Sequence, residues 1–153
     1  MTTYEHIVEI AAPIERVFTF DSNPENWSRT MPSLQDLEVL EETENGARMQ
    51  ATYKLLGIAL DTEMELTIVQ PNEHILVTVE STGMKGEVHN YFSETDAGTE
   101  IRHQADYEFG ESLRDRLLEP VATRYNNRQF KNHLQNTKDV IEAEVAAETM
   151  TPA

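Results

Sequence analysis

The order of two periodicities along the chain most constrains its fold. Between residues 34 and 109, apolar and polar residues alternate with a period of two, which is typical of strands that bury one face. From about Ser112 to Ala147 the apolar residues recur at helical spacing instead. A long helix that follows a run of strands has to bury its apolar side against their sheet. The sequence therefore predicts an α+β fold in which a curled antiparallel sheet encloses a long C-terminal helix.

Turn-forming residues divide the alternating region into strands. Asn45-Gly46, Gly57, Gln70-Pro71-Asn72, the stretch from Gly83 to Gly86, and Asp96-Ala97-Gly98 interrupt it at regular intervals. Together with a first strand near the N-terminus, they predict a seven-stranded sheet. The predicted strands span residues 3–11, 34–43, 46–55, 58–69, 73–82, 87–95 and 99–109.

Two short helices are predicted between the first and second strands. Pro13 suits the first position of a helix, and the apolar residues that follow it share one helical face as far as about Phe20. Asn23 is a good N-cap for a second helix that starts at Pro24, and Pro32 ends that helix.

The C-terminal helix carries two apolar stripes that point in different directions. One consists of Leu117, Val121 and Tyr125; the other consists of Phe130, Leu134, Thr137, Ile141 and Val145. Pro120 lies near the change of face, so we expect a kink or a break near residues 118–120 and a movable lid before it. Residues 1–147 are predicted to form a single domain, and residues 148–153 a frayed tail.

The charge balance is extreme, with 28 acidic and 12 basic residues and a formal net charge of −16. A field of this sign repels phosphate backbones and anionic lipids, which argues against nucleic-acid binding. The acids are spread along the whole chain, as in proteins of salt-accumulating halophiles, where salt screens their mutual repulsion. We therefore expect a halophilic protein; a basic protein partner is the alternative explanation.

The sequence predicts a cytoplasmic protein with no integral membrane contact. No stretch approaches the ~20 apolar residues of a membrane span, and the polar N-terminus lacks the layout of a signal peptide. The chain has no cysteine, which excludes disulfides and thiolate metal ligands. The sequence says nothing of the oligomeric state.

Several short segments, taken together, resemble one known superfamily. They are Ala12-Pro13 with Val17-Phe18, Pro24 with Trp27 and Pro32, Gly98-Thr99, and the run from Leu134 to Glu142. In this order and at these spacings the chain resembles the START-like (SRPBCC) helix-grip superfamily over almost its full length. Within it, the chain looks most like the polyketide cyclase/dehydrase and lipid-transport group. The resemblance implies a deep, mainly apolar cavity between the sheet and the long helix.

The inner face of the predicted sheet would line this cavity. Its residues are mostly apolar with a few polar members, as in ligand pockets, although an ordinary core has the same composition. We expect the protein to bind or carry a small hydrophobic ligand, such as a lipid, a quinone or a polyketide-like molecule. Trp27 either stacks on this ligand at the cavity mouth or pins the short helices to the sheet. The expected ligand-binding residues are Trp27, Met49, Ala51, Tyr53, Leu60, Thr62, Met64, Leu66, Val77, Val79, Val88, Asn90, Phe92, His103, Tyr107, Leu117, Val121 and Tyr125.

An enzyme of the cyclase or dehydratase type is an alternative. His103 and Tyr107 share one face of a strand and can polarise a carbonyl or move a proton, with Asn90 to orient them. Each of them can equally satisfy a hydrogen bond inside the sheet. Cyclases of the superfamily often hold a polyketide with a buried arginine, whereas Arg48 and Arg102 fall on the predicted outer face. This departure favours binding over catalysis.

No metal site and no cofactor are expected. The five histidines lack two-ligand spacing on a helix, and the sequence has no glycine-rich phosphate or dinucleotide motif. A protein-interaction module is a third functional class, which would require a contiguous apolar patch on the outer face. The acidic outer row of Asp61, Glu63 and Glu65 argues against it.

Overall fold

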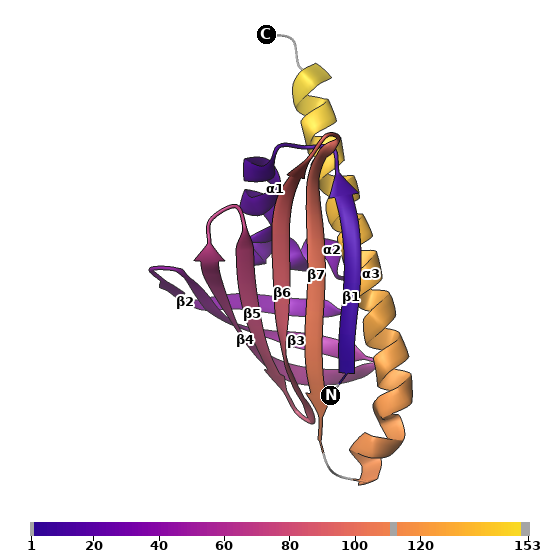
Figure 1. Cartoon of the computed structure of the whole chain (residues 1–153). Helices are drawn as coiled ribbons and strands as arrows, with labels where there is room; N and C mark the ends of the chain where they lie inside the picture. The colour runs from indigo at the N-terminus through magenta and orange to yellow at the C-terminus, as the bar shows by residue number, and fades with distance from the viewer. Residues whose placement is uncertain (1, 111–112, 151–153) are drawn as a thin grey trace.

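A single curled sheet wraps around one long helix (Figure 1). The computed structural model describes residues 2–110 and 113–150 of the 153-residue chain. The strands are β1 (Thr2–Ile10), β2 (Leu34–Thr43), β3 (Gly46–Leu55), β4 (Ile58–Gln70), β5 (His74–Ser81), β6 (Met84–Thr95) and β7 (Gly98–Phe109). The helices are α1 (Ile14–Asp21), the 3₁₀ turn η1 (Pro24–Asn26), α2 (Trp27–Thr30) and α3 (Leu113–Met150). The predicted helix-grip α+β fold is confirmed.

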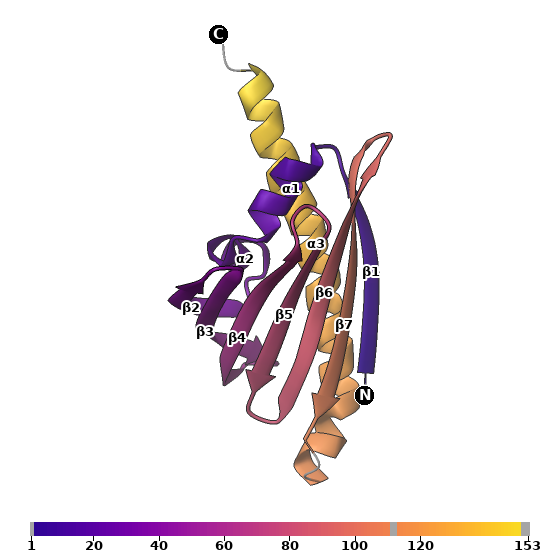
Figure 2. The same cartoon turned by 60° about the vertical axis from the view of Figure 1, so that its left-hand side comes forward.

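The sheet has the strand order β1-β7-β6-β5-β4-β3-β2, and every neighbouring pair is antiparallel. Strand β1 lies beside the last strand, with His6 opposite His103. The six later strands form a meander, as the regular turn residues predicted. Figure 2 shows the sheet curving past α3, with α1 and α2 on the same side of the sheet as α3.

The largest error in the strand boundaries concerns β6, which begins at Met84 and not at residue 87. Gly86 was interpreted as part of the turn, but it lies inside the strand opposite Tyr107. A Cβ atom at Gly86 would lie 2.4 Å from the carbonyl oxygen of Asp106 and 2.5 Å from the Tyr107 ring. Glycine is therefore required here by close packing, whereas Gly83, at φ 79°, makes the turn.

The inner face of the sheet follows the predicted alternation. Met49, Met64, Ile75 and Ile101 are buried, whereas Glu63 and Glu65 on the alternate positions of β4 are exposed. Burial of one face only is what a period of two produces in an antiparallel sheet. The His89 and Tyr91 side chains, which obscured the pattern in β6, lie on the outer face.

Helix α3 buries a different stripe from the one predicted for its first half. Leu117 and Val121 are exposed, at 70% and 46%, and Tyr125 is half-buried. Ala122 and Asn126 are buried instead, and they continue the stripe of Phe130, Leu134, Thr137 and Ile141. Asn126 is buried because it accepts a hydrogen bond from the Tyr53 hydroxyl at 2.7 Å. A hydrophobic pattern does not register such a polar residue.

Helix α3 runs through Pro120 without a break. It also continues past Glu148, where we expected the frayed tail to begin, as far as Met150. Glu148 forms an ion pair with Arg16 of α1 at 2.6 Å. This ion pair holds the last part of α3 against α1. The predicted helix start at Ser112 and the end of the predicted tail lie outside the described residues.

Side-chain hydrogen bonds tie the short helices to α3. The Thr30 hydroxyl lies 2.8 Å from Nδ1 of His133, and Asn136 donates to the Thr30 carbonyl at 3.0 Å. Just after α2, the Ser33 hydroxyl donates to Gln129 at 2.8 Å. These bonds hold α2 and the residues that follow it against the long helix.

We expect stability to increase with salt, because acidic residues face one another across strands. Glu63 lies opposite Glu80, and Glu87 lies opposite Asp106. Such like-charge pairs are destabilising, and salt shortens the Debye length from about 10 Å at 0.1 M to about 3 Å at 1 M. The melting temperature should rise by several degrees between about 50 mM and 3 M KCl. The variant Glu63→Gln/Glu80→Gln should show a smaller rise; equal stability at both concentrations would contradict the halophile hypothesis.

Candidate ligand-binding site

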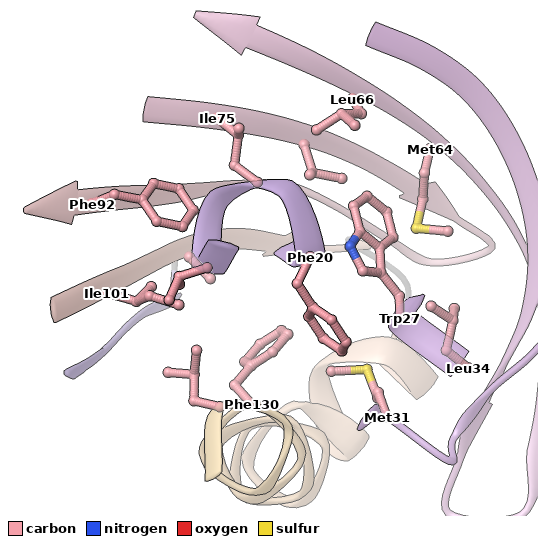
Figure 3. Close-up of a cluster of buried hydrophobic side chains, with 14 of the residues drawn as sticks. Phe20, Trp27, Met31, Leu34, Met64, Leu66, Ile75, Phe92, Ile101 and Phe130 are labelled. Atoms are coloured by element: carbon pink, nitrogen blue, oxygen red, sulfur yellow. The ribbon is translucent and has the colours of Figure 1, made fainter. Parts of the chain in front are cut away.

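A cavity of about 90 Å³ lies between the inner face of the sheet, the short helices and α3. Figure 3 shows the buried apolar side chains of this region: Phe130 points from α3 towards Phe20 and Met31, while Met64 and Ile75 project from the strands. The lining residues are Asp21, Trp27, Met31, Leu34, Met64, Ile75, Val77, Val79, Val88, Asn90, His103, Phe130 and His133. Most of them are apolar, and the polar ones are buried.

Three buried polar side chains of this wall form a hydrogen-bonded chain. Nδ2 of Asn90 donates to Oδ2 of Asp21 at 2.7 Å, and Nδ1 of His103 lies 2.7 Å from Oδ1 of Asn90. Asp21 comes from the end of α1, whereas Asn90 and His103 are paired residues of β6 and β7. Each of the three is at most 5% exposed.

Burial shifts the titration of this chain in opposite directions at its two ends. Removal from water raises the pKa of Asp21 to about 6, although the hydrogen bond from Asn90 opposes the rise. Burial, reinforced by His133 and His6, lowers the pKa of His103 to about 3. Near neutral pH, His103 is therefore neutral and Asp21 is largely ionised. His103 can accept a hydrogen bond there, and it does not carry a charge.

His133 of α3 is a second buried imidazole in the wall. Its Nδ1 atom lies 2.8 Å from the Thr30 hydroxyl, and burial lowers its pKa to about 4. The cavity therefore has neutral imidazoles on two sides, one from the sheet and one from the helix.

Seven of the predicted ligand-binding residues line the cavity. They are Trp27, Met64, Val77, Val79, Val88, Asn90 and His103. Others belong to the sheet interior without lining it, namely Met49, Ala51, Tyr53, Leu60, Thr62, Leu66, Phe92 and Tyr107. On α3, Tyr125 donates a hydrogen bond to the Lys54 carbonyl at 2.9 Å, and Leu117 and Val121 face solvent. The predicted placement of Leu117, Val121 and Tyr125 in the cavity wall is therefore wrong.

The three candidate catalytic residues are brought together only in part. Asn90 contacts His103 directly. Tyr107 packs against Phe130, with ring centroids 5.7 Å apart and an angle of 19° between the rings, and it does not line the cavity. Burial raises the pKa of its hydroxyl, which makes proton loss from it harder.

The Trp27 side chain connects the short helices to one another and also lies at the cavity. Its Nε1–H donates to the Asp21 carbonyl at 2.8 Å, which pins η1 and α2 to the end of α1. Trp27 also lines the cavity and is 8% exposed.

Sequence reasoning missed Asp21, Met31, Leu34, Ile75, Phe130 and His133 as lining residues. Ile75 and Phe130 lie on apolar faces of the predicted strand and helix, and a signal also existed for the two charged or polar residues Asp21 and His133. Asp21 follows Phe18 by three residues and Val17 by four, so it continues the buried face of α1. His133 follows Phe130 by three and precedes Thr137 by four on the buried face of α3. Charged and polar residue types concealed this periodicity.

A wider depression, of about 610 Å³, lies on the outer face of the sheet. Charged residues dominate its lining, among them Glu63, Glu80, Glu87 and Lys85. Ligand pockets are mostly apolar with few polar groups, so the smaller inner cavity is the better candidate.

Histidines also meet on the outer face, where Nε2 of His74 lies 2.9 Å from Nδ1 of His89. Among the described residues, no group of three or more histidine, cysteine, aspartate or glutamate side chains is arranged to hold a metal ion. Nor does any helix in residues 2–110 and 113–150 have the length and apolar character needed to span a membrane.

Solved structures share this architecture at low sequence identity. A protein from Thermus thermophilus is 16% identical, with a TM-score of 0.82 over 94% of this chain and 99% of that one. The ZhuI aromatase/cyclase from Streptomyces sp. R1128 is 15% identical, with a TM-score of 0.84 over 94% and 95% of the two chains. A START superfamily protein from Mycobacterium smegmatis is 14% identical, with a TM-score of 0.77 over 92% and 97%. At these identities the likeness establishes the fold.

No curated protein matches the sequence. The sequence profile of one family does match it, over residues 1–142, and so includes every strand, both short helices and most of α3. The chain therefore belongs to the polyketide cyclase/dehydrase and lipid transport family.

Proposed function

We propose that this protein binds a small hydrophobic molecule in the cavity between the curled sheet and α3. The observation that supports this proposal is the composition of the cavity, in which an apolar wall surrounds a few buried hydrogen-bonding groups. Such groups orient a ligand that apolar contacts retain. The family description, which names cyclases, dehydrases and lipid transport, supports the same role. Catalysis of a cyclase or dehydratase type stays a prediction.

The cavity volume limits how a ligand can be accommodated. Pockets for drug-sized ligands measure roughly 300–1,000 Å³, whereas this cavity measures about 90 Å³. A lipid-sized ligand therefore requires the wall to move outwards. Met31 and Met64 line the cavity and are flexible side chains that can repack.

Native mass spectrometry of the protein purified from its own organism tests this proposal. We expect an adduct that disappears on denaturation, because a retained ligand dissociates when the walls unfold. The variant Val88→Phe, which fills the cavity, should lose the adduct. Val69→Phe is the matched control, because Val69 is 50% exposed. Absence of an adduct from the native protein, or an adduct retained in Val88→Phe, would count against the cavity as its site.

A further inference from the structure

The hydrogen-bonded chain of Asp21, Asn90 and His103 fixes which groups donate and which accept. An ionised carboxylate can only accept, so the amide nitrogen of Asn90 faces Asp21, at 2.7 Å. The amide oxygen of Asn90 is then the atom that faces His103. An amide oxygen can only accept, so Nδ1 of His103 has to carry the proton in this contact.

The tautomer of His103 follows from this order. A neutral imidazole has one protonated nitrogen, so proton occupancy at Nδ1 leaves Nε2 as a bare acceptor. This Nε2 atom is buried and has no hydrogen-bond partner among the described residues. Most buried polar atoms in proteins are paired, and one that is not is destabilising. His103 lines the cavity, where a bound molecule can supply the missing donor.

The charge of the site limits which chemical groups the bound molecule can carry. Asp21 lines the same cavity and is connected to His103 through Asn90. A ligand carboxylate would meet one buried negative charge and an acceptor, without a positive partner among the lining residues. A neutral hydroxyl, by contrast, can donate to the free nitrogen without adding charge.

We propose that the ligand carries a neutral hydroxyl group, of the phenol, enol or alcohol type, on an apolar body, and that this hydroxyl donates to Nε2 of His103. The inference rests on the proposed function and specifies its ligand class. Asp21 and Asn90 then act as positioning residues, since they hold the acceptor orientation of His103 without touching the ligand hydroxyl.

Three single-ring probes test the inference by NMR titration of the full chain at pH 7.5: phenol, toluene and benzoate. Toluene is more apolar than phenol, so burial of apolar surface alone would make toluene bind more tightly than phenol. We expect the opposite order, with phenol bound about five- to tenfold more tightly than toluene, as one hydrogen bond provides. Benzoate should bind more weakly than either.

The variant His103→Phe removes the acceptor and keeps an aromatic ring, so toluene should then bind more tightly than phenol. His6→Phe is the matched control, because His6 bonds to Asn127 and does not line the cavity. Nitrogen-15 NMR of histidine-labelled wild-type protein gives a readout that needs no variant. It should show a proton on Nδ1 of His103 and a shift of the Nε2 resonance on addition of phenol.

The outcomes separate the two proposals. If none of the probes binds, the proposed function fails together with the inference. If toluene binds as tightly as phenol, or benzoate binds best, a binding cavity exists and the hydroxyl inference fails. A proton on Nε2 of His103 in the wild-type protein also overturns the inference.

Discussion

Replacing Asp21 with asparagine is expected to stabilise the protein at pH 8 by about 3 kcal/mol and to have little effect near pH 4. The pKa of this carboxyl rises from 3.8 to about 6 because folding buries it. Between these two values the folded state binds more protons than the unfolded state, so unfolding free energy falls as the pH rises. Above pH 6 the folded state bears the full cost of a buried charge, which asparagine removes.

Urea unfolding of both proteins between pH 4 and pH 8 measures this difference. Asp61→Asn, at an exposed position of β4, is the control and should change the unfolding free energy by less than about 0.5 kcal/mol at either pH. A destabilised Asp21→Asn variant at pH 8, or a stabilisation that does not depend on pH, would contradict the assignment of Asp21 as an unfavourable buried charge. Unfavourable charges are often retained at functional sites, which is consistent with a position in the cavity wall.

Gly98→Ala is expected to destabilise the protein by about 3–5 kcal/mol. Gly98 has φ 149°, and a Cβ atom there would lie 2.2 Å from the Ile10 carbonyl oxygen and 2.8 Å from the Ala12 nitrogen. Both are backbone atoms, which cannot rotate away. The next residue, Thr99, donates to the Ala12 carbonyl at 2.8 Å, so the substitution also disturbs the connection that places α1. Urea unfolding measures the loss.

Gly57→Ala separates this clash from the effect of a positive φ angle. Gly57 has φ 83°, and a Cβ atom there would have open space around it. This variant should lose only about 1–2 kcal/mol, the cost of an L-residue in that conformation. Similar losses in the two variants would show that the contact with the β1–α1 connection carries little energy.

The sheet was predictable because its signals are local. Strand boundaries follow from turn residues and from a period of two, and a one-residue error would expose the whole buried row. The pairing of β1 with β7, the first and last strands of the chain, was not part of these local signals. The early start of β6 was not predictable, because Gly86 looks like a turn residue in the sequence. It is a glycine because it packs closely against Tyr107 on β7.

The cavity wall was predictable only where it is apolar or belongs to the sheet. Asp21, Asn126 and His133 are buried because each has a partner from a distant segment: Asn90, Tyr53 and Thr30 respectively. A hydrophobic pattern treats such residues as solvent-facing. For that reason it assigned Leu117 and Val121 to the buried stripe of α3, where Ala122 and Asn126 lie instead.

The sequence by itself determined the seven strands, the two short helices, the long helix and the inner face of the sheet, because periodicity and turn chemistry are written into neighbouring residues. The tertiary structure decided which polar residues are buried and how they are paired. Asp21, Asn90 and His103 come from three elements, and only folding places them in one hydrogen-bonded chain. Desolvation then sets the protonation states of Asp21 and His103, because burial shifts their pKa values only in the folded protein.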